Sequence, residues 1–255
     1  MNTISKMLKP YAILLILFII PLASVLIISK TFNKDLNTGH RKNTKTDSLT
    51  EVLTYKGIDS VLDLCEHHTY ENLNEAYISF LGYDTYKFSS KMKGRVFYKI
   101  YNADTSHILV GKYTIGNFLP KDDVFFEDMN PKDSSFFQYL CMDKEILYRF
   151  LDLILLLREK GYTDDFRIKD GYRYPSFNKR TGGATYSQHV YGLAIDIYVD
   201  DVDRNGTIDK DVDKKIVLDL LDNTIIKDKG GIGRYPWSNV IHFDLRGVKA
   251  RWDSQ

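Results

Sequence analysis

The segment Gly182-Gly183-Ala184-Thr185-Tyr186-Ser187-Gln188-His189-Val190-Tyr191-Gly192-Leu193-Ala194-Ile195-Asp196-Ile197 is the stretch from which the fold can be inferred. It carries a histidine and, seven positions later, an aspartate inside a short apolar run that predicts a buried strand. His242 lies in a second such run, residues 239–245. Two imidazoles and a carboxylate on adjacent strands would form a three-ligand zinc site with a fourth position open for water.

The spacing of His189 and Asp196 does not by itself establish a metal site. The two residues do not share a helix face as the histidines of an H-E-x-x-H motif do, so the chain must double back between them. Gly192 supplies a bend at the required place. A histidine in an apolar strand is more often a satisfied core residue, and this spacing alone leaves both interpretations open.

The composition is that of a globular protein with a sizeable core: 255 residues, 44% hydrophobic and 27% charged. A net charge of +1 gives no support for nucleic acid as a partner. Cys65 and Cys141 are compatible with export and with one disulfide. Neither cysteine lies in a cluster with metal-ligand spacing, so we do not expect them to bind a metal.

The N-terminus predicts a membrane anchor over residues 1–30. Lys6 and Lys9 precede an uncharged apolar span, residues 10–29, whose length as a helix is roughly 30 Å, about one hydrocarbon core. A cleavable signal peptide is the alternative. In either case the rest of the chain is extracytoplasmic, and the polar residues 31–50 are expected to be a flexible stalk.

The remaining chain predicts an α+β domain. A helix is clearest over residues 143–160, with Asp143 as N-cap and Gly161 as stop signal. The other expected elements are a helical stretch within 52–81, a hairpin of 95–101 with 107–115, a loop over 120–132, strands at 166–169, 194–199 and 239–245, a helix over 213–223, and a turn-rich loop over 230–236.

Several motifs together resemble the superfamily of zinc D-Ala-D-Ala carboxypeptidases and murein endopeptidases, which shares its fold with hedgehog signalling domains. The motifs are Gly171-Tyr172-Arg173, Ser187-Gln188-His189-x-x-Gly192-x-Ala194-x-Asp196, Gly231-x-Gly233-x-Tyr235-Pro236, His242-Phe243-Asp244 and Ala250-Arg251-Trp252. They occur in matching order over residues 120–255, and the last two are most similar to exported murein endopeptidases. The resemblance implies an antiparallel-sheet zinc peptidase domain over 119–255. It does not assign residues 51–118, which we expect to be a small accessory region or an N-terminal extension of the fold.

The resemblance also assigns roles to individual residues. It makes His189, Asp196 and His242 the zinc ligands. Arg173 would bind the substrate and stabilise the developing oxyanion. Ser187 would contact substrate or orient His189.

The general base is the residue that the resemblance does not supply. Several branches of the superfamily place an acid three positions before the last histidine, where this chain has Asn239. Asp244 is the best remaining carboxylate, because alternation along a strand puts it on the same face as His242. We expect Asp244 to be either the base or the partner that orients a ligand.

A second candidate metal site follows Asp196. Oxygen-bearing side chains at the first, third, fifth and ninth positions of an acidic loop, with a glycine at the sixth and an apolar residue at the eighth, are typical of an EF-hand or dockerin calcium loop. They are Asp201, Asp203, Asn205 and Asp209, and Thr207 at the seventh position is a further candidate ligand. Val212 stands where a bidentate acid is expected, so an acidic solvated turn is the alternative.

The function predicted from the sequence is zinc-dependent hydrolysis of peptide bonds in peptidoglycan stems or cross-links. The alternative is a non-catalytic cell-wall-binding module that keeps the fold, and Asn239 is the feature that favours it. Peptidoglycan peptides and, through the N-terminal segment, a membrane are the expected partners.

Overall fold

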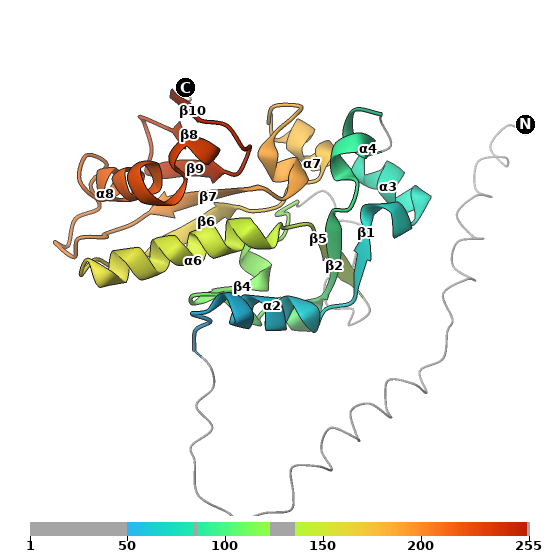
Figure 1. Cartoon of the computed structure of the whole chain (residues 1–255), viewed down its shortest axis with the longest axis horizontal. Coiled ribbons are helices and arrows are strands. Elements are labelled where there is room, and N and C mark those ends of the chain that lie inside the picture. The colour runs from blue at the N-terminus through green and yellow to red at the C-terminus, as the bar shows by residue number, and fades with distance from the viewer. Residues whose placement is uncertain (1–49, 84–85, 123–135, 254–255) are drawn as a thin grey trace, which may run out of the picture. The chain divides into compact units, whose positions relative to one another are not determined.

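The computed structural model describes residues 50–83, 86–122 and 136–253, which belong to one compact unit, Ser48–Gln255 (Figure 1). The expected anchor, nearly all of the stalk and most of the loop at 120–132 lie outside the described residues. No helix in the described part of the chain is long and apolar enough to cross a membrane.

A five-stranded sheet carries the C-terminal half, with strand order β10-β8-β9-β7-β6. Neighbouring strands are antiparallel except β10 and β8, which are parallel. The strands are β6 (Phe166–Asp170), β7 (Ala194–Val199), β8 (Gly231–Arg234), β9 (Val240–Asp244) and β10 (Ala250–Asp253). The α+β class and the strands around Asp196 and His242 agree with the sequence prediction.

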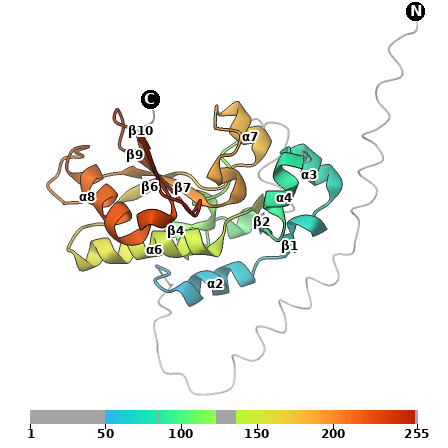
Figure 2. The same cartoon turned by 45° about the horizontal axis from the view of Figure 1, so that its top comes forward.

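Helix α6 (Lys144–Glu159) forms because apolar residues recur on one side, and it begins where the Asp143 side chain accepts a hydrogen bond from the Glu145 amide. It lies between α2 (Tyr55–Asp63) and the main sheet (Figures 1 and 2). Phe150 on α6 packs against Phe243 of β9, with ring centroids 6.3 Å apart. α8 (Asp213–Leu220) and the π-helical turn Leu221–Ile225 pack beside it.

The N-terminal residues build a smaller sheet, of order β1-β2-β5, and cover it with short helices. Its buried side chains join the same hydrophobic core as α6 and the main sheet. Besides α2, the elements are β1 (His67–Thr69), α3 (Glu75–Leu81), α4 (Tyr86–Met92), β2 (Val96–Tyr101), β3 (Ile108–Val110), β4 (Tyr113–Thr114) and β5 (Phe137–Leu140), with 3₁₀ turns at Tyr70–Asn72, Asn102–Asp104 and Ile115–Asn117.

Two expectations about local structure are wrong, and one is met in part. Helix does form within 52–81, but as two helices, α2 and α3, with β1 between them. The predicted hairpin does not form: β2 pairs with β1 and β5, where its buried residues find neighbours, and β3 pairs with β4 instead. The glycine-rich residues 231–234 form strand β8 rather than a loop, and pair with β9 and β10. Position 233 requires glycine because a Cβ there would lie 2.8 Å from the Trp252 ring on β10.

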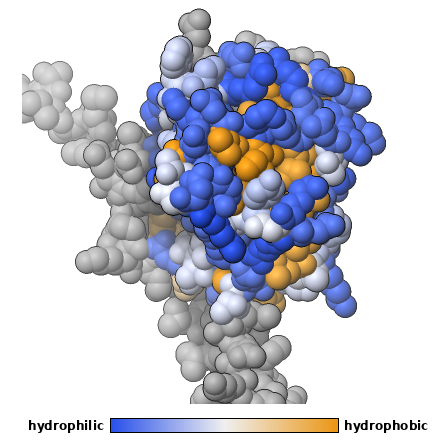
Figure 3. Space-filling view, turned by 90° about the vertical axis from the view of Figure 1, so that its left-hand side faces the viewer, coloured by the Kyte–Doolittle hydropathy of each residue, from blue (hydrophilic) through white to orange (hydrophobic). Residues whose placement is uncertain are grey.

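Cys65 and Cys141 are both free thiols, so the disulfide that the sequence allowed is not formed. Cys141 is buried, and this burial raises the pKa of its thiol to about 12. The surface drawn in Figure 3 is mostly hydrophilic around a smaller hydrophobic area, as is usual for a chain of this composition.

Gly192 provides a test of the bend before β7. Its φ is +68°, and a Cβ there would lie 2.1 Å from the Cys141 carbonyl oxygen. We expect Gly192→Ala to lower the free energy of unfolding by roughly 3–5 kcal/mol, measured by denaturant titration. Gly182→Ala is the matched control: it also has a positive φ, +74°, but open space around it, so it should cost only about 1–2 kcal/mol. Equal losses would contradict the steric argument.

Candidate active site

Asp196 lies in the middle of β7, directly opposite His242 on β9. Alternation along β7 turns Ile195 and Ile197 into the core on the other face of the sheet from Asp196. Asp196 is 2% exposed and His242 is 6% exposed, so the two side chains meet in a nearly dry environment.

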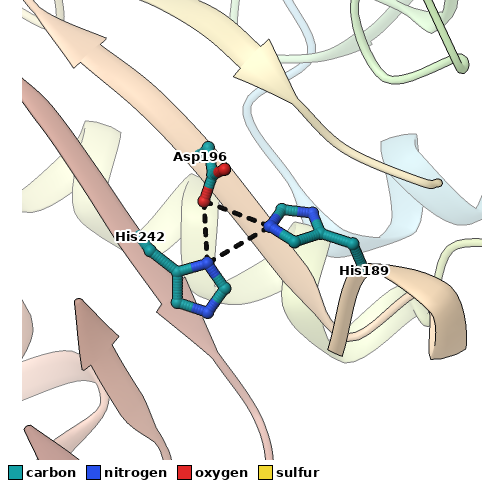
Figure 4. A group of neighbouring side chains, drawn as sticks. All are labelled: His189, Asp196 and His242. Atoms are coloured by element: carbon teal, nitrogen blue, oxygen red, sulfur yellow. Dashed lines mark hydrogen bonds and ion pairs between the residues drawn. The ribbon is translucent and has the colours of Figure 1, made fainter. Parts of the chain in front are cut away.

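His189 reaches this pair from the 3₁₀ turn Gln188–Tyr191. The turn ends at Gly192, whose left-handed conformation reverses the chain into β7. His189 Nε2 lies 3.1 Å from Asp196 Oδ1 and 3.2 Å from His242 Nδ1, and His242 Nδ1 lies 2.7 Å from Asp196 Oδ1 (Figure 4). The structure thus brings together the three residues that the sequence analysis selected.

The hydrogen bonds around the two imidazoles fit a bound metal ion. His189 Nδ1 donates to the Gly171 carbonyl at 2.6 Å, and His242 Nε2 donates to Asp244 Oδ2 at 2.8 Å. In neutral rings the inward-facing nitrogens are then both acceptors, and they face a third acceptor, Asp196 Oδ1. Three acceptors at this separation repel unless a cation or proton lies among them.

The separations also suit zinc. Two ligands at 2.0–2.1 Å from a tetrahedral ion lie about 3.3 Å from each other, close to the observed 2.7–3.2 Å. Two histidine nitrogens and one aspartate oxygen are a donor set that zinc prefers. These residues fit a zinc ion with a position left for substrate or water.

Electrostatics within the cluster favour a carboxylate beside a cationic group. Burial would raise the pKa of Asp196, but the hydrogen bonds and charges of His189 and His242 hold it well below its ordinary value. Burial would likewise lower the pKa of His242, but Asp196 and Asp244 outweigh this effect and raise it to about 9. Without a metal ion the cluster therefore retains a proton, and a metal ion that binds must displace it.

A cleft of about 520 Å³ opens over the three residues. Arg173, on the loop after β6, lies in its wall with Nη2 3.7 Å from Asp196 Oδ2. Its Nε is buried and has no hydrogen-bond partner among the described residues, so it is an unsatisfied donor beside the cleft. Ser187 also lines the cleft, and its side chain does not cap the turn that it precedes.

Asp244 is not placed to act on a substrate. It is fully buried, and its carboxylate accepts hydrogen bonds from His242, the Gly231 amide and Arg246. Although burial alone would raise its pKa, His242 and Arg246 keep the pKa of Asp244 well below its ordinary value. Of the two roles expected from the sequence, the geometry supports orienting His242. Asn239, at the position of the missing acid, lies before β9 and does not line the cleft.

Several cleft residues were not singled out by the sequence analysis. Arg246 lines the cleft while its guanidinium holds Asp244 and stacks on Trp252, 4.6 Å from the ring centroid. The Trp252 ring in turn packs against His242, with centroids 5.2 Å apart. Arg246 lies two residues beyond the end of β9, so no strand pattern indicates it. Lys169 also lines the cleft without a signal in the sequence. Tyr186 and Tyr235 line it too; both lie in stretches quoted from the sequence, where neither was given a role.

In the predicted calcium loop, the acidic side chains form hydrogen bonds with the backbone of the same loop. Asp201, Asp203 and Asp213 have carboxylate oxygens within 4.8 Å of one another. These oxygens accept hydrogen bonds from backbone amides of the loop, including those of Asn205, Gly206 and Val202. Asn205 and Asp209 accept from backbone amides in the same way, and Thr207 follows in the loop. The loop is therefore an acidic turn whose carboxylates already accept hydrogen bonds from its own backbone amides. Calcium binding stays an untested prediction.

Comparison with known families agrees with the site. Residues 141–244 match the family model described as Peptidase M15, and this segment contains Arg173 and all three candidate ligands. The match is to a family of zinc D-Ala-D-Ala carboxypeptidase-like peptidases, so the resemblance noted in the sequence is confirmed over residues 141–244. No curated protein and no solved structure matches the chain.

Removal of one ligand tests the metal centre. His189→Ala leaves two ligands and should reduce bound zinc from about one equivalent to below about 0.1 per chain, measured by elemental analysis after dialysis. His107→Ala is the control, since its side chain is 60% exposed and its Nδ1 lies 3.8 Å from Asp104 Oδ1, away from the candidate ligands. A zinc-loaded His189→Ala protein would refute the assignment.

Asp244→Asn separates the two roles considered for this residue. If Asp244 orients His242, zinc affinity should fall about 10–100-fold in a competition titration. If it is the general base, affinity should be unchanged and kcat should fall about 10²–10⁴-fold. Asp222→Asn is the control for loss of a carboxylate that pairs with an arginine: Asp222 lies in the π-helical turn and its ion pair is with Arg251 on the edge strand β10.

Proposed function

We propose that this protein is a zinc-dependent peptidase that hydrolyses peptide bonds in peptidoglycan stem peptides or cross-links, as a D,D-carboxypeptidase or endopeptidase. The observation that carries the proposal is that His189 Nε2, Asp196 Oδ1 and His242 Nδ1 lie close together and line an open cleft. Each imidazole is held in this orientation by a hydrogen bond from its other ring nitrogen. The match of residues 141–244 to the Peptidase M15 model supports a peptidase.

The chemistry of the cleft suits an amide substrate. A zinc ion bound by the three side chains would supply Lewis acidity for the scissile carbonyl and lower the pKa of water. Arg173 presents a permanently charged guanidinium beside this position, with Nε not otherwise engaged. It would bind the carbonyl oxygen and stabilise the charge that develops there.

The charge of the cleft favours an anionic peptide. Lys169, Arg173 and Arg246 line it, and Asp196 is the only acidic residue among its described lining. Arg246 is neutralised by Asp244, which leaves Lys169 and Arg173 to attract carboxylates of the substrate. Stem peptides of peptidoglycan carry such groups.

A non-catalytic cell-wall-binding module is the second candidate function. The feature that favours it is the absence of a free carboxylate from the described cleft lining, since Asp196 is engaged by both histidines and Asp244 is buried. Such a module would bind the same peptides without cleaving them.

We also propose that the domain acts outside the cytoplasm, attached to the membrane by residues 1–30. The support is the apolar segment 10–29 after Lys6 and Lys9, and the peptidoglycan substrate, which lies on that side of the membrane.

Digestion of purified muropeptides tests the peptidase against the binding module. The protein should release shortened or uncross-linked peptides, detected by mass spectrometry. A chelator should slow the reaction at least about 100-fold, and added zinc should restore it. His189→Ala is the inactive control. Binding of muropeptides that a chelator does not change, with no cleavage, would support the module and contradict the peptidase.

A further inference from the structure

Tyr83 belongs to the N-terminal part of the chain, outside the segment that matches the peptidase family. It follows Gly82, the left-handed residue that ends α3, and its side chain is fully buried. The ring packs edge-on against Tyr70, Phe88 and Phe97, which fix its position among residues of the smaller sheet and its helices.

The hydroxyl of Tyr83 reaches into the active-site loops. It donates to the carbonyl of Val190, the residue directly after the candidate ligand His189. It also lies 3.2 Å from the hydroxyl of Tyr172, the residue directly before Arg173. One buried phenol therefore joins the loop that carries a ligand to the loop that carries the substrate-binding arginine.

These two loops depend on each other for their geometry. His189 Nδ1 donates to Gly171, and the Arg173 amide donates to the His189 carbonyl at 3.2 Å. The first bond sets which nitrogen of His189 faces the site. A shift of Val190 or Tyr172 would therefore move both His189 and Arg173.

The N-terminal part supports the same loops at a second place. The end of α3 packs on α7 (Pro175–Arg180), the helix that begins two residues after Arg173. A Cβ on Gly82 would lie 3.2 Å from the Ser176 amide nitrogen. Burial raises the pKa of Tyr83 well above its ordinary value, so its hydroxyl keeps its proton and remains a donor.

We propose that Tyr83 is a positioning residue for the metal centre: its hydroxyl holds the His189 turn against the Arg173 loop. Residues 50–118 are then part of the active-site structure rather than an accessory to it. The proposal rests on the zinc site of the proposed function, and on hydrogen bonds that exist without the metal.

Tyr83→Phe tests this role because it removes only the hydroxyl. We expect zinc affinity to fall about 10–100-fold in a chelator competition titration, and the visible spectrum of the cobalt-substituted protein to change. In the metal-free protein, amides of residues 186–193 should exchange hydrogen about tenfold faster.

Tyr113→Phe is the matched control. Tyr113 is also buried, and its hydroxyl is bonded at 2.7 Å to the Asp164 carbonyl and at 3.1 Å to the Phe166 amide, at the far end of β6 from Gly171. It should lower Tm comparably while leaving zinc affinity, the cobalt spectrum and exchange at 186–193 unchanged. A Tyr83→Phe protein that behaves like this control would overturn the proposal.

Tyr172→Phe keeps the test decisive if Tyr83→Phe does not fold. It removes the other hydroxyl of the pair and should weaken zinc binding in the same direction, by about threefold to tenfold; wild-type affinity in this variant would also overturn the proposal. If the wild-type protein binds no zinc, the proposed function fails, and the exchange measurement still decides the role of Tyr83.

Discussion

The pairing of β7 with β9 is the constraint on which the site depends. It places Asp196 opposite His242, so a slip of one residue would turn one of these side chains into the hydrophobic core. The register is set by the apolar neighbours on the other face, Ile195, Ile197 and Phe243, which are fully buried. The same residues that stabilise the domain therefore determine which polar side chains meet.

A second layer of side chains holds the three central ones in place. The Gly171 carbonyl accepts a hydrogen bond from His189 Nδ1, and the Asp244 carboxylate accepts one from His242 Nε2. Arg246 in turn donates to Asp244. Trp252 packs on both His242 and Arg246, and the absence of a side chain at Gly233 makes room for its ring. A polar network this deeply buried is stable only when every member has a hydrogen-bond partner. Substitution of a residue in the outer layer should therefore change the orientation of His189 or His242.

The sequence predicted those parts of the structure that local patterns determine. The period and the cap residue of α6 are local, as are the apolar runs around Asp196 and His242, and these predictions agree with the structure. The motif order indicated the family whose model matches residues 141–244, and it selected the three residues that the structure brings together. The smaller sheet could not be predicted, because β2 finds its partners at β1 and β5 rather than at the next strand along the chain. Strand β8 was missed because its glycines are selected by close packing, not by strand propensity. From the sequence alone, Asp244 was a candidate for the general base. Only the structure shows that its carboxylate is engaged by hydrogen bonds from Arg246 and His242.

The cleft draws its walls from distant parts of the chain, from Lys169 to Trp252, and Tyr83 supports it from further upstream. Contacts of such long sequence separation form slowly, because a large loop must close before they contribute stability. During synthesis, the cleft cannot be completed until Trp252 has left the ribosome, whereas α6 can form much earlier. A nascent chain would therefore carry folded helices well before His189, Asp196 and His242 stood together in a completed cleft.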